Sequence, residues 1–168
     1  MKTIFLDFDG VLHPSTAILD KNVATLALQG GQKLISSGLF VWSHHLEEAI
    51  RQAEGDDEIV IVVHSSWRSQ PWMSSALARE SLGPLGHRFA GFVDRYGDRE
   101  TCIAKFAGRM DIQDFLILDD SHAEFSVLAD RLVTTNPLLG VSDPKTLAQV
   151  STWASCSRSH KQQNSCTA

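Results

Sequence analysis

Short apolar runs rich in β-branched residues alternate with longer helix-like segments along most of this chain. Such near-continuous apolar runs are typical of strands in a parallel sheet that is covered on both faces. We expect strands at residues 3–6, 59–63, 115–118 and 132–134, and a less regular one at 89–93.

The segments between these runs carry helical patterns and helix-capping residues. Ser43 and Asp143 stand where N-caps are expected, and Pro144 suits a first helical turn. We expect helices at residues 44–53, 71–81, 99–108, 122–130 and 144–153. The alternation predicts a three-layer α/β/α fold, Rossmann-like, with a central parallel sheet.

Two stretches do not follow the alternation. Residues 14–38 contain Gly30-Gly31 and Ser36-Ser37-Gly38, which indicate an irregular insertion with a short helix at 22–28. With the helix that follows it, the insertion spans residues 14–58 and has room for only a small cap over the strand ends. We therefore expect one domain over residues 1–154 and a flexible, serine-rich tail over 155–168.

The composition sets limits on the partners of the chain. Its 168 residues are 43% hydrophobic and 21% charged, as in an ordinary globular domain. The net charge of −5 provides no general basic field for a phosphate backbone, so any nucleic-acid contact has to be local. The longest apolar run is far short of a bilayer span and the N-terminus lacks a signal-peptide pattern, so we predict a cytoplasmic protein without membrane contact. The three cysteines share no metal-ligand or redox spacing and are expected to be reduced.

The first predicted strand runs directly into Asp7-Phe8-Asp9-Gly10. Alternate residues of an extended strand face the same way, so Asp7 and Asp9 can approach one ligand at the carboxyl end of the sheet, where ligands bind. A hard cation such as Mg²⁺ would relieve the repulsion between them and leave room for a phosphate. The same residues also fit a polar strand-to-loop exit in which Gly10 supplies an unusual backbone angle.

Two further strands are expected to bring polar groups to the same edge. Ser65-Ser66 follow the second strand, where they could bind a phosphate oxygen or simply cap a turn. Asp119-Asp120 follow a later strand, with Glu124 nearby, and adjacent carboxylates there are unfavourable unless a cation or several donors hold them. Together, the three strand ends indicate an acidic active site.

These motifs resemble the phosphatases of the haloacid dehalogenase-like (HAD) superfamily. That pattern is Asp-x-Asp-Gly after strand one, Ser or Thr after strand two, a basic residue before a helix and an acidic pair after a later strand. The chain offers Asp7-Phe8-Asp9-Gly10, Ser65, a basic residue near Arg99, and Asp119-Asp120, over residues 1 to about 153. The stretches Ser65-Ser66-Trp67-Arg68, Leu118-Asp119-Asp120 and 133–140 are similar to the small HAD domains associated with RNA-repair proteins.

The resemblance implies Mg²⁺-dependent phosphomonoester hydrolysis through an aspartyl-phosphate. It makes Asp7 the nucleophile and Asp9 the general acid and base. It implies a Mg²⁺ ion held by Asp7, the Asp9 carbonyl and Asp120. Asp119 and Glu124 are then supporting residues that orient water or neighbouring groups.

The resemblance also implies that Ser65, Ser66 and a basic side chain bind the phosphate. Arg99, at a helix entry, is one candidate, because its fork geometry suits phosphate. Lys105, one and a half turns later, is the other, and the family more often has a lysine in this role. Either cation also fits an ordinary surface charge on an amphipathic helix.

Other residues near the motifs have open roles. His13 and His122 flank the acidic motifs and could contact substrate or tune a carboxylate. Trp67 is expected to anchor its loop in the core rather than to stack on a base. Arg68 could pair with an acid of the site or hold substrate.

Three functions follow as alternatives. The first is a phosphatase acting on a phosphorylated small molecule or nucleotide, the second a nucleic-acid end-processing phosphatase, and the third a non-catalytic binding module that keeps the fold. All the expected acids are present, which favours an enzyme, and a small cap predicts an open site that admits a large substrate.

Overall fold

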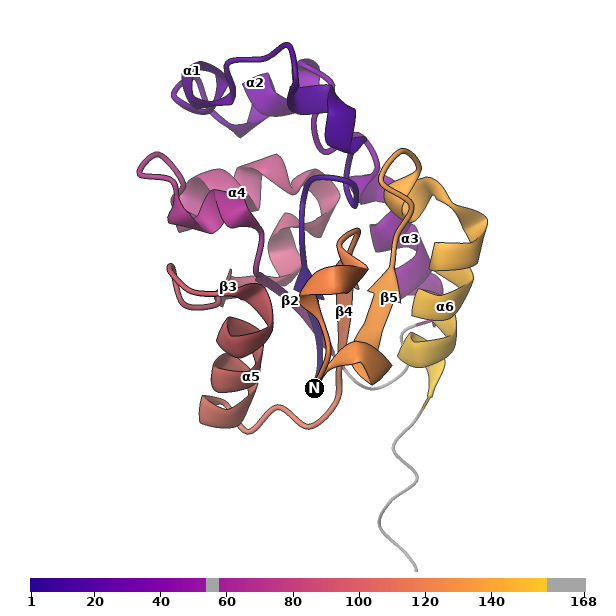
Figure 1. Ribbon diagram of the computed structural model, residues 1–168. Coiled ribbons are helices and arrows are strands. Elements are labelled where there is room, and N and C mark those ends of the chain that lie inside the picture. Colours follow the sequence, from indigo (N-terminus) through magenta and orange to yellow (C-terminus); the bar gives the residue numbers. More distant parts are fainter. Residues whose placement is uncertain (54–57, 157–168) are drawn as a thin grey trace, which may run out of the picture.

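One parallel sheet forms the centre of the molecule (Figure 1). The computed structural model describes residues 1–53 and 58–156. The strand order is β3-β2-β1-β4-β5, formed by β1 (Lys2–Leu6), β2 (Ile59–Val63), β3 (Phe89–Phe92), β4 (Phe115–Asp119) and β5 (Leu132–Thr134). Each predicted strand is confirmed to within one residue at either end.

Helices cover both faces of this sheet. They are α3 (Ser43–Ala53), α4 (Ser75–Ser81), α5 (Arg99–Arg109) and α6 (Pro144–Ser155). Side chains alternate along a strand, so Ile4 and Leu6 pack in the core with α3, α4 and α6, whereas Phe5 packs on the opposite face with α5. Both faces of β1 are therefore buried, and the predicted three-layer α/β fold is confirmed.

Most of the predicted helices are confirmed. Asp98 caps α5 by accepting a hydrogen bond from the Thr101 amide, and Asp143 caps α6 in the same way. The helix predicted at 71–81 is shorter than expected, because Ser74 caps α4 and the helix begins after it. None of the helices in the described part of the chain has the length and apolar character needed to cross a lipid bilayer.

The helix predicted at 122–130 is wrong. Two short 3-10 turns take its place, η4 (His122–Glu124) and η5 (Ala129–Arg131). The carboxylate of Glu100 on α5 accepts hydrogen bonds from the backbone amides of Ser126, Val127 and Leu128. These amides therefore point to a side chain of another element instead of to carbonyls one helical turn earlier.

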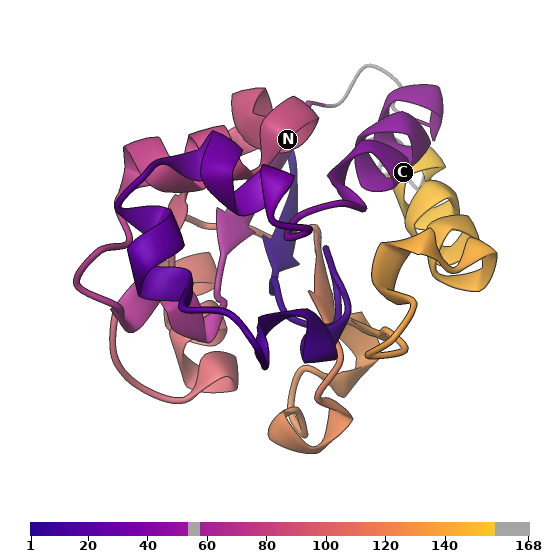
Figure 2. The ribbon, with the colours of Figure 1, turned by 90° about the horizontal axis from the view of Figure 1, so that it is seen from above.

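The segment 14–38 is more regular than the predicted loop. It contains η1 (Ser15–Ile18), α1 (Val23–Ala27) and α2 (Gly31–Ser36). Gly30, with a φ of 102°, joins α1 to α2, and a Cβ on Gly31 would lie 2.6 Å from the Ser81 amide nitrogen. The glycine pair thus permits a tight turn and close packing on α4. Figures 1 and 2 show α1 and α2 beyond the carboxyl ends of the strands, on the side of α4.

Parts of the predicted insertion and tail lie outside the described residues, namely 54–57 and 157–168. Ser155, at the start of the predicted tail, is the last residue of α6, and Cys156 follows it.

Candidate active site

Three strands end at the same level and place Asp7, His64 and Asp119 beside one another. Leu6 of β1 is in register with Val63 of β2 and with Leu118 of β4. The amide of Asp7 donates to the Leu118 carbonyl (3.0 Å), and the amide of His64 donates to the Leu6 carbonyl (3.0 Å). The sheet itself therefore brings these side chains together.

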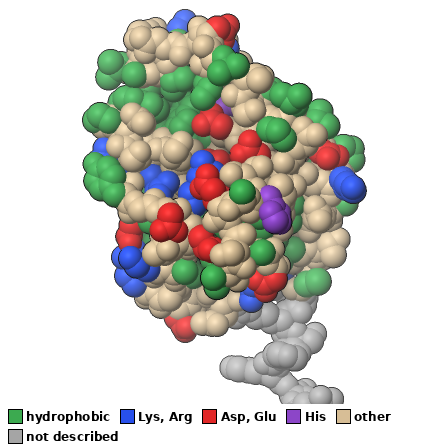
Figure 3. Space-filling view, viewed as in Figure 1, with side chains coloured by type: hydrophobic (Ala, Val, Ile, Leu, Met, Phe, Trp, Pro, Cys, Tyr) green, Lys and Arg blue, Asp and Glu red, His purple; other side chains and the backbone are tan. Residues whose placement is uncertain are grey.

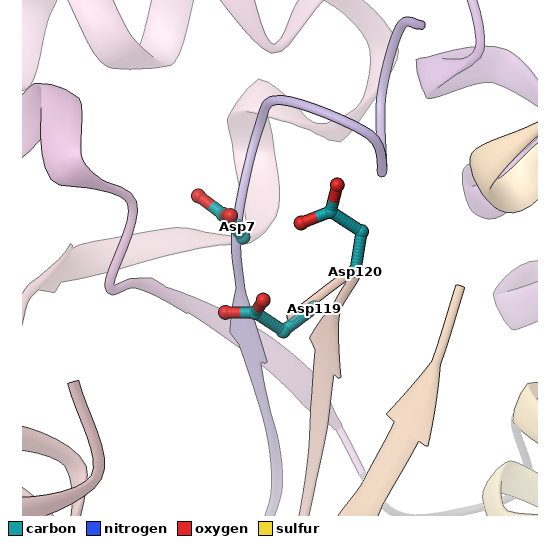
Figure 4. A group of neighbouring side chains, drawn as sticks. All are labelled: Asp7, Asp119 and Asp120. Carbon is teal, nitrogen blue, oxygen red and sulfur yellow. The ribbon is translucent and has the colours of Figure 1, made fainter. Parts of the chain in front are cut away.

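Three carboxylates form a cluster at this edge. One oxygen from each of Asp7, Asp119 and Asp120 lies within 4.8 Å of the others (Figure 4). Within the described residues, Oδ1 of Asp7 is buried and has no hydrogen-bond partner. Gly10 has a φ of 71°, and a Cβ there would lie 2.3 Å from Oδ2 of Asp120, so glycine keeps this space open. An unpartnered buried oxygen beside two further carboxylates fits a hard cation with oxygen ligands, such as Mg²⁺.

Arg99 is the cation that the chain itself supplies to this cluster. Its Nη1 donates to Oδ2 of Asp7 (3.0 Å) and to Oδ2 of Asp119 (2.7 Å), and its Nε lies 3.3 Å from a carboxylate oxygen of Glu124. The residue begins α5, whose first turn is fixed by the Asp98 cap. The helix entry therefore directs Arg99 at the strand ends.

Burial shifts the ionisation of the site. It raises the pKa of Asp7 to about 7 and that of Asp119 to about 6, while Arg99 opposes the rise in both. Burial also raises the pKa of Asp120. Burial, reinforced by Arg99, lowers the pKa of His64 to about 3, so this imidazole is neutral where its Nδ1 lies 3.6 Å from Oδ2 of Asp119. Several perturbed groups at one edge are typical of a functional site.

Asp9 lies in the turn after β1 and is held separately from the cluster. One carboxylate oxygen lies 2.9 Å from Nε2 of His13, and the other accepts a hydrogen bond from Nε1 of Trp67 (2.9 Å). The amide of Gly10 donates to the His13 carbonyl (2.9 Å), and the Thr135 hydroxyl donates to the Gly10 carbonyl (2.7 Å). The turn that carries Asp9 is therefore fixed on both sides.

Comparison with known proteins assigns this arrangement to a family. The model of the family described as "HAD domain in Swiss Army Knife RNA repair proteins" matches residues 3–146. The chain belongs to this family. No curated protein and no solved structure matches the chain. The match includes β2 to β5, all of β1 except Lys2, and every acidic residue named above, and the resemblance inferred from the motifs is confirmed.

The other residues predicted to bind phosphate in this HAD domain differ in burial and in position. Ser65 is buried, caps η2 (Ser66–Ser69), and its side chain lowers the pKa of Asp7 against the larger effect of burial. Ser66 is exposed. Lys105 is exposed further along α5. The structure thus places Arg99 at the carboxylates and Lys105 away from them.

An open pocket of about 360 Å³ lies at Arg99, beside the carboxylate cluster. Its lining includes Ser66, Ser69, Arg95, Tyr96, Arg99 and Glu124. Figure 3 shows acidic and basic side chains next to one another in the middle of this face. The pocket therefore reaches Arg99 and Glu124, and its lining includes none of the three clustered carboxylates.

The structure shows contacts of Arg68 that the sequence did not predict. Its buried guanidinium donates to the carbonyls of His64 (2.6 Å), Asp94 (2.8 Å) and Gly97 (3.0 Å). These hydrogen bonds make Arg68 a bridge between two loops, and the residue also lines the pocket beside Arg99. His122 is exposed at the start of η4.

Two contacts of the site were not predicted from the sequence. Trp67 is buried against Phe8, as expected of an anchor, but its indole N–H also holds Asp9. No local signal reveals a hydrogen bond between residues 58 positions apart. His64 at the carboxylates could have been found, because it follows β2 directly and neighbouring parallel strands end together.

Proposed function

We propose that this HAD domain hydrolyses phosphomonoesters in a Mg²⁺-dependent reaction through an aspartyl-phosphate on Asp7. The observation that carries the proposal is that the two oxygens of the Asp7 carboxylate differ in their hydrogen bonding. Its Oδ2 accepts a hydrogen bond from Arg99, whereas its buried Oδ1 has no partner among the described residues. We assign Oδ2, beside Arg99, to the attack on phosphorus and leave the unpaired Oδ1 for the cation.

The proposed reaction has two displacements at phosphorus. In the first, Asp7 attacks the phosphorus atom, the bond to the leaving oxygen breaks, and Asp9 gives that oxygen a proton. In the second, Asp9 takes a proton from a water molecule, which attacks phosphorus and breaks its bond to Asp7. Inorganic phosphate leaves and both carboxyl groups return to their starting state. Arg99, which donates to Asp7, and Ser65, whose side chain acts on the Asp7 carboxyl, can donate to the phosphoryl oxygens.

The chain's own oxygens fit a Mg²⁺ site. Asp7, the Asp9 carbonyl and Asp120 would hold the ion, which neutralises the carboxylates and the charge on the transferring phosphoryl group. Asp119 is the less suitable ligand of the acidic pair, because Oδ2 accepts from Arg99 and Oδ1 accepts from the Ser121 amide (2.7 Å). We therefore assign Asp119 to holding Arg99, with Glu124 as a second support.

The test is phosphate release from an aryl phosphate by the purified chain. We expect turnover that requires Mg²⁺, stops with EDTA and is lost in Asp7→Asn. Asp130→Asn is the matched control, since it makes the same change at an exposed position on η5. If Asp7→Asn turns over like the wild type, Asp7 is not the nucleophile. If the metal-loaded wild type releases no phosphate from a broad panel, the non-catalytic binding module replaces the enzyme.

A nucleic-acid end is the second candidate substrate. The family description names RNA repair proteins, and the pocket beside Arg99 offers the cation of Arg95 and the exposed ring of Tyr96. An aromatic ring and a guanidinium suit a terminal nucleotide. We expect faster release from terminal phosphates of oligonucleotides than from free nucleotides if this candidate is right. The reverse order would favour a small phosphorylated molecule.

A further inference from the structure

The carboxylate of Asp9 contacts two buried rings from different parts of the chain, one at each oxygen. Trp67 Nε1 and His13 Nε2 each lie 2.9 Å from a different oxygen of this carboxylate. His13 is fully buried and Trp67 is 5% exposed. An indole N–H can only donate, so the Trp67 contact is a hydrogen bond accepted by Asp9.

A backbone amide fixes the tautomer of His13. The amide of Phe40 donates to Nδ1 of His13 (3.3 Å). A backbone N–H is a donor only, so Nδ1 has to be the unprotonated nitrogen. In the neutral imidazole the proton is then on Nε2, and His13 donates to Asp9.

The inserted segment provides this amide. Phe40 follows α2 and has a φ of 58°, in the left-handed region that non-glycine residues rarely adopt. Its ring packs on Phe8, His13 and Trp67, with centroid distances of 4.9, 5.4 and 5.6 Å. This aromatic packing holds the Phe40 amide against His13, so the insertion reaches the Asp9 turn through a buried contact.

From these contacts we propose that Trp67 and His13 are positioning residues for proton transfer by Asp9, with the Phe40 amide setting the tautomer of His13. The inference rests on the proposed phosphatase reaction. Each carboxylate oxygen has two lone pairs, and the two rings use one on each oxygen. The other lone pairs stay available to the leaving oxygen and to water, in an orientation that the rings hold fixed. The 22% exposure of the Asp9 side chain is consistent with access from solvent.

Leaving-group dependence distinguishes positioning from packing. A poor leaving group such as an alkoxide needs a proton from Asp9, whereas dinitrophenolate leaves without one. Trp67→Phe removes the indole N–H and keeps a ring. Trp72→Phe makes the same change in a neighbouring tryptophan, which packs on Trp67 at 5.5 Å, and is the control.

The experiment measures kcat/KM for a series of phosphomonoesters from dinitrophenyl to alkyl phosphate. For Trp67→Phe we expect a loss under about threefold with the dinitrophenyl ester and at least about thirtyfold with the alkyl ester, since a positioned acid supplies about 10²–10⁴-fold. Trp72→Phe should change all substrates by one common factor. A common factor for Trp67→Phe, or the same slope in Trp72→Phe, overturns the proposal.

A second measurement needs no turnover and no variant of Trp67. Nitrogen NMR of the wild-type chain should show His13 protonated at Nε2, and the Trp67 indole N–H resonance should move in Asp9→Asn but not in Asp20→Asn, a change at an exposed position. Protonation at Nδ1, or an indole resonance that ignores Asp9→Asn, overturns the arrangement. If the wild type proves inactive while this NMR pattern holds, the phosphatase function fails and the proton-transfer role fails with it, whereas the contacts themselves stand.

Discussion

Arg99→Gln should destabilise the metal-free protein in a pH-dependent way. The substitution removes the cation that bridges Asp7 and Asp119 and leaves two buried carboxylates without it. Removing one partner of a buried ion pair costs about 3–5 kcal/mol. Since the Arg99 side chain is 17% exposed, we expect a loss of about 3 kcal/mol in unfolding free energy at pH 8, at the low end of that range.

The loss should nearly vanish in acid. The pKa values of Asp7 and Asp119, about 7 and about 6, place both groups mostly in their neutral forms at pH 5. Arg99 then has no charged partner in the pair, and the difference between variant and wild type should fall below about 1 kcal/mol.

Urea denaturation in EDTA at both pH values measures this directly. Lys105→Gln is the matched control, because it removes the same charge from the same helix at an exposed position, and should stay within about 0.5 kcal/mol of the wild type. An equal loss for Arg99→Gln at pH 5 and pH 8, or an equal effect of Lys105→Gln, would refute the electrostatic reasoning.

Two further predictions concern the metal and the turn that faces it. The folded-state pKa values of Asp7 and Asp119 are raised above their ordinary value of 3.8, so the folded chain binds more protons than the unfolded chain between about pH 4 and pH 7. The unfolding free energy of the metal-free wild type should therefore fall as pH rises through this window. A Mg²⁺ concentration of 100 times the Kd at pH 8 should add about 2.7 kcal/mol at that pH, and the same concentration should add much less at pH 5, where both carboxyl groups are mostly protonated. Thermal melts in which Mg²⁺ stabilises the chain no more at pH 8 than at pH 5 would contradict this. Gly10→Ala should weaken Mg²⁺ binding at least about tenfold, because its Cβ would lie 2.3 Å from Oδ2 of Asp120 at a φ of 71°. Calorimetric titration checks this against Gly108→Ala, where a Cβ meets nothing within 4 Å, and equal Mg²⁺ affinity in both variants would count against the proposed site.

The sequence predicts the sheet and the positions of the acids because both depend on local patterns. Apolar runs identify β1, β2 and β4, and parallel pairing brings the residues that follow these strands to one edge, as it does for Asp7 and Asp119. The predicted start of a helix at residue 99 likewise locates Arg99.

The remaining features depend on contacts between distant side chains. The helix predicted at 122–130 is wrong, and there Glu100, on another element, accepts hydrogen bonds from the amides of Ser126, Val127 and Leu128. The Gly30-Gly31 pair predicts a loop by composition, whereas close packing on α4 requires it. The hydrogen bond from Trp67 to Asp9 corresponds to no periodic pattern in the sequence, because it joins two loops that only the folded sheet brings together.

Trapping the covalent intermediate tests the central claim most directly. In Asp9→Asn the second displacement loses its base, so the phosphorylated form should accumulate when the Mg²⁺-loaded protein meets an aryl phosphate with a good leaving group. Borohydride reduction followed by peptide mass spectrometry then identifies the modified residue. We predict reduction at Asp7, and none when Asp7→Asn is added to the same variant. Modification at Ser65 or elsewhere, or sustained phosphate release with Asp7 unmodified, would contradict the account.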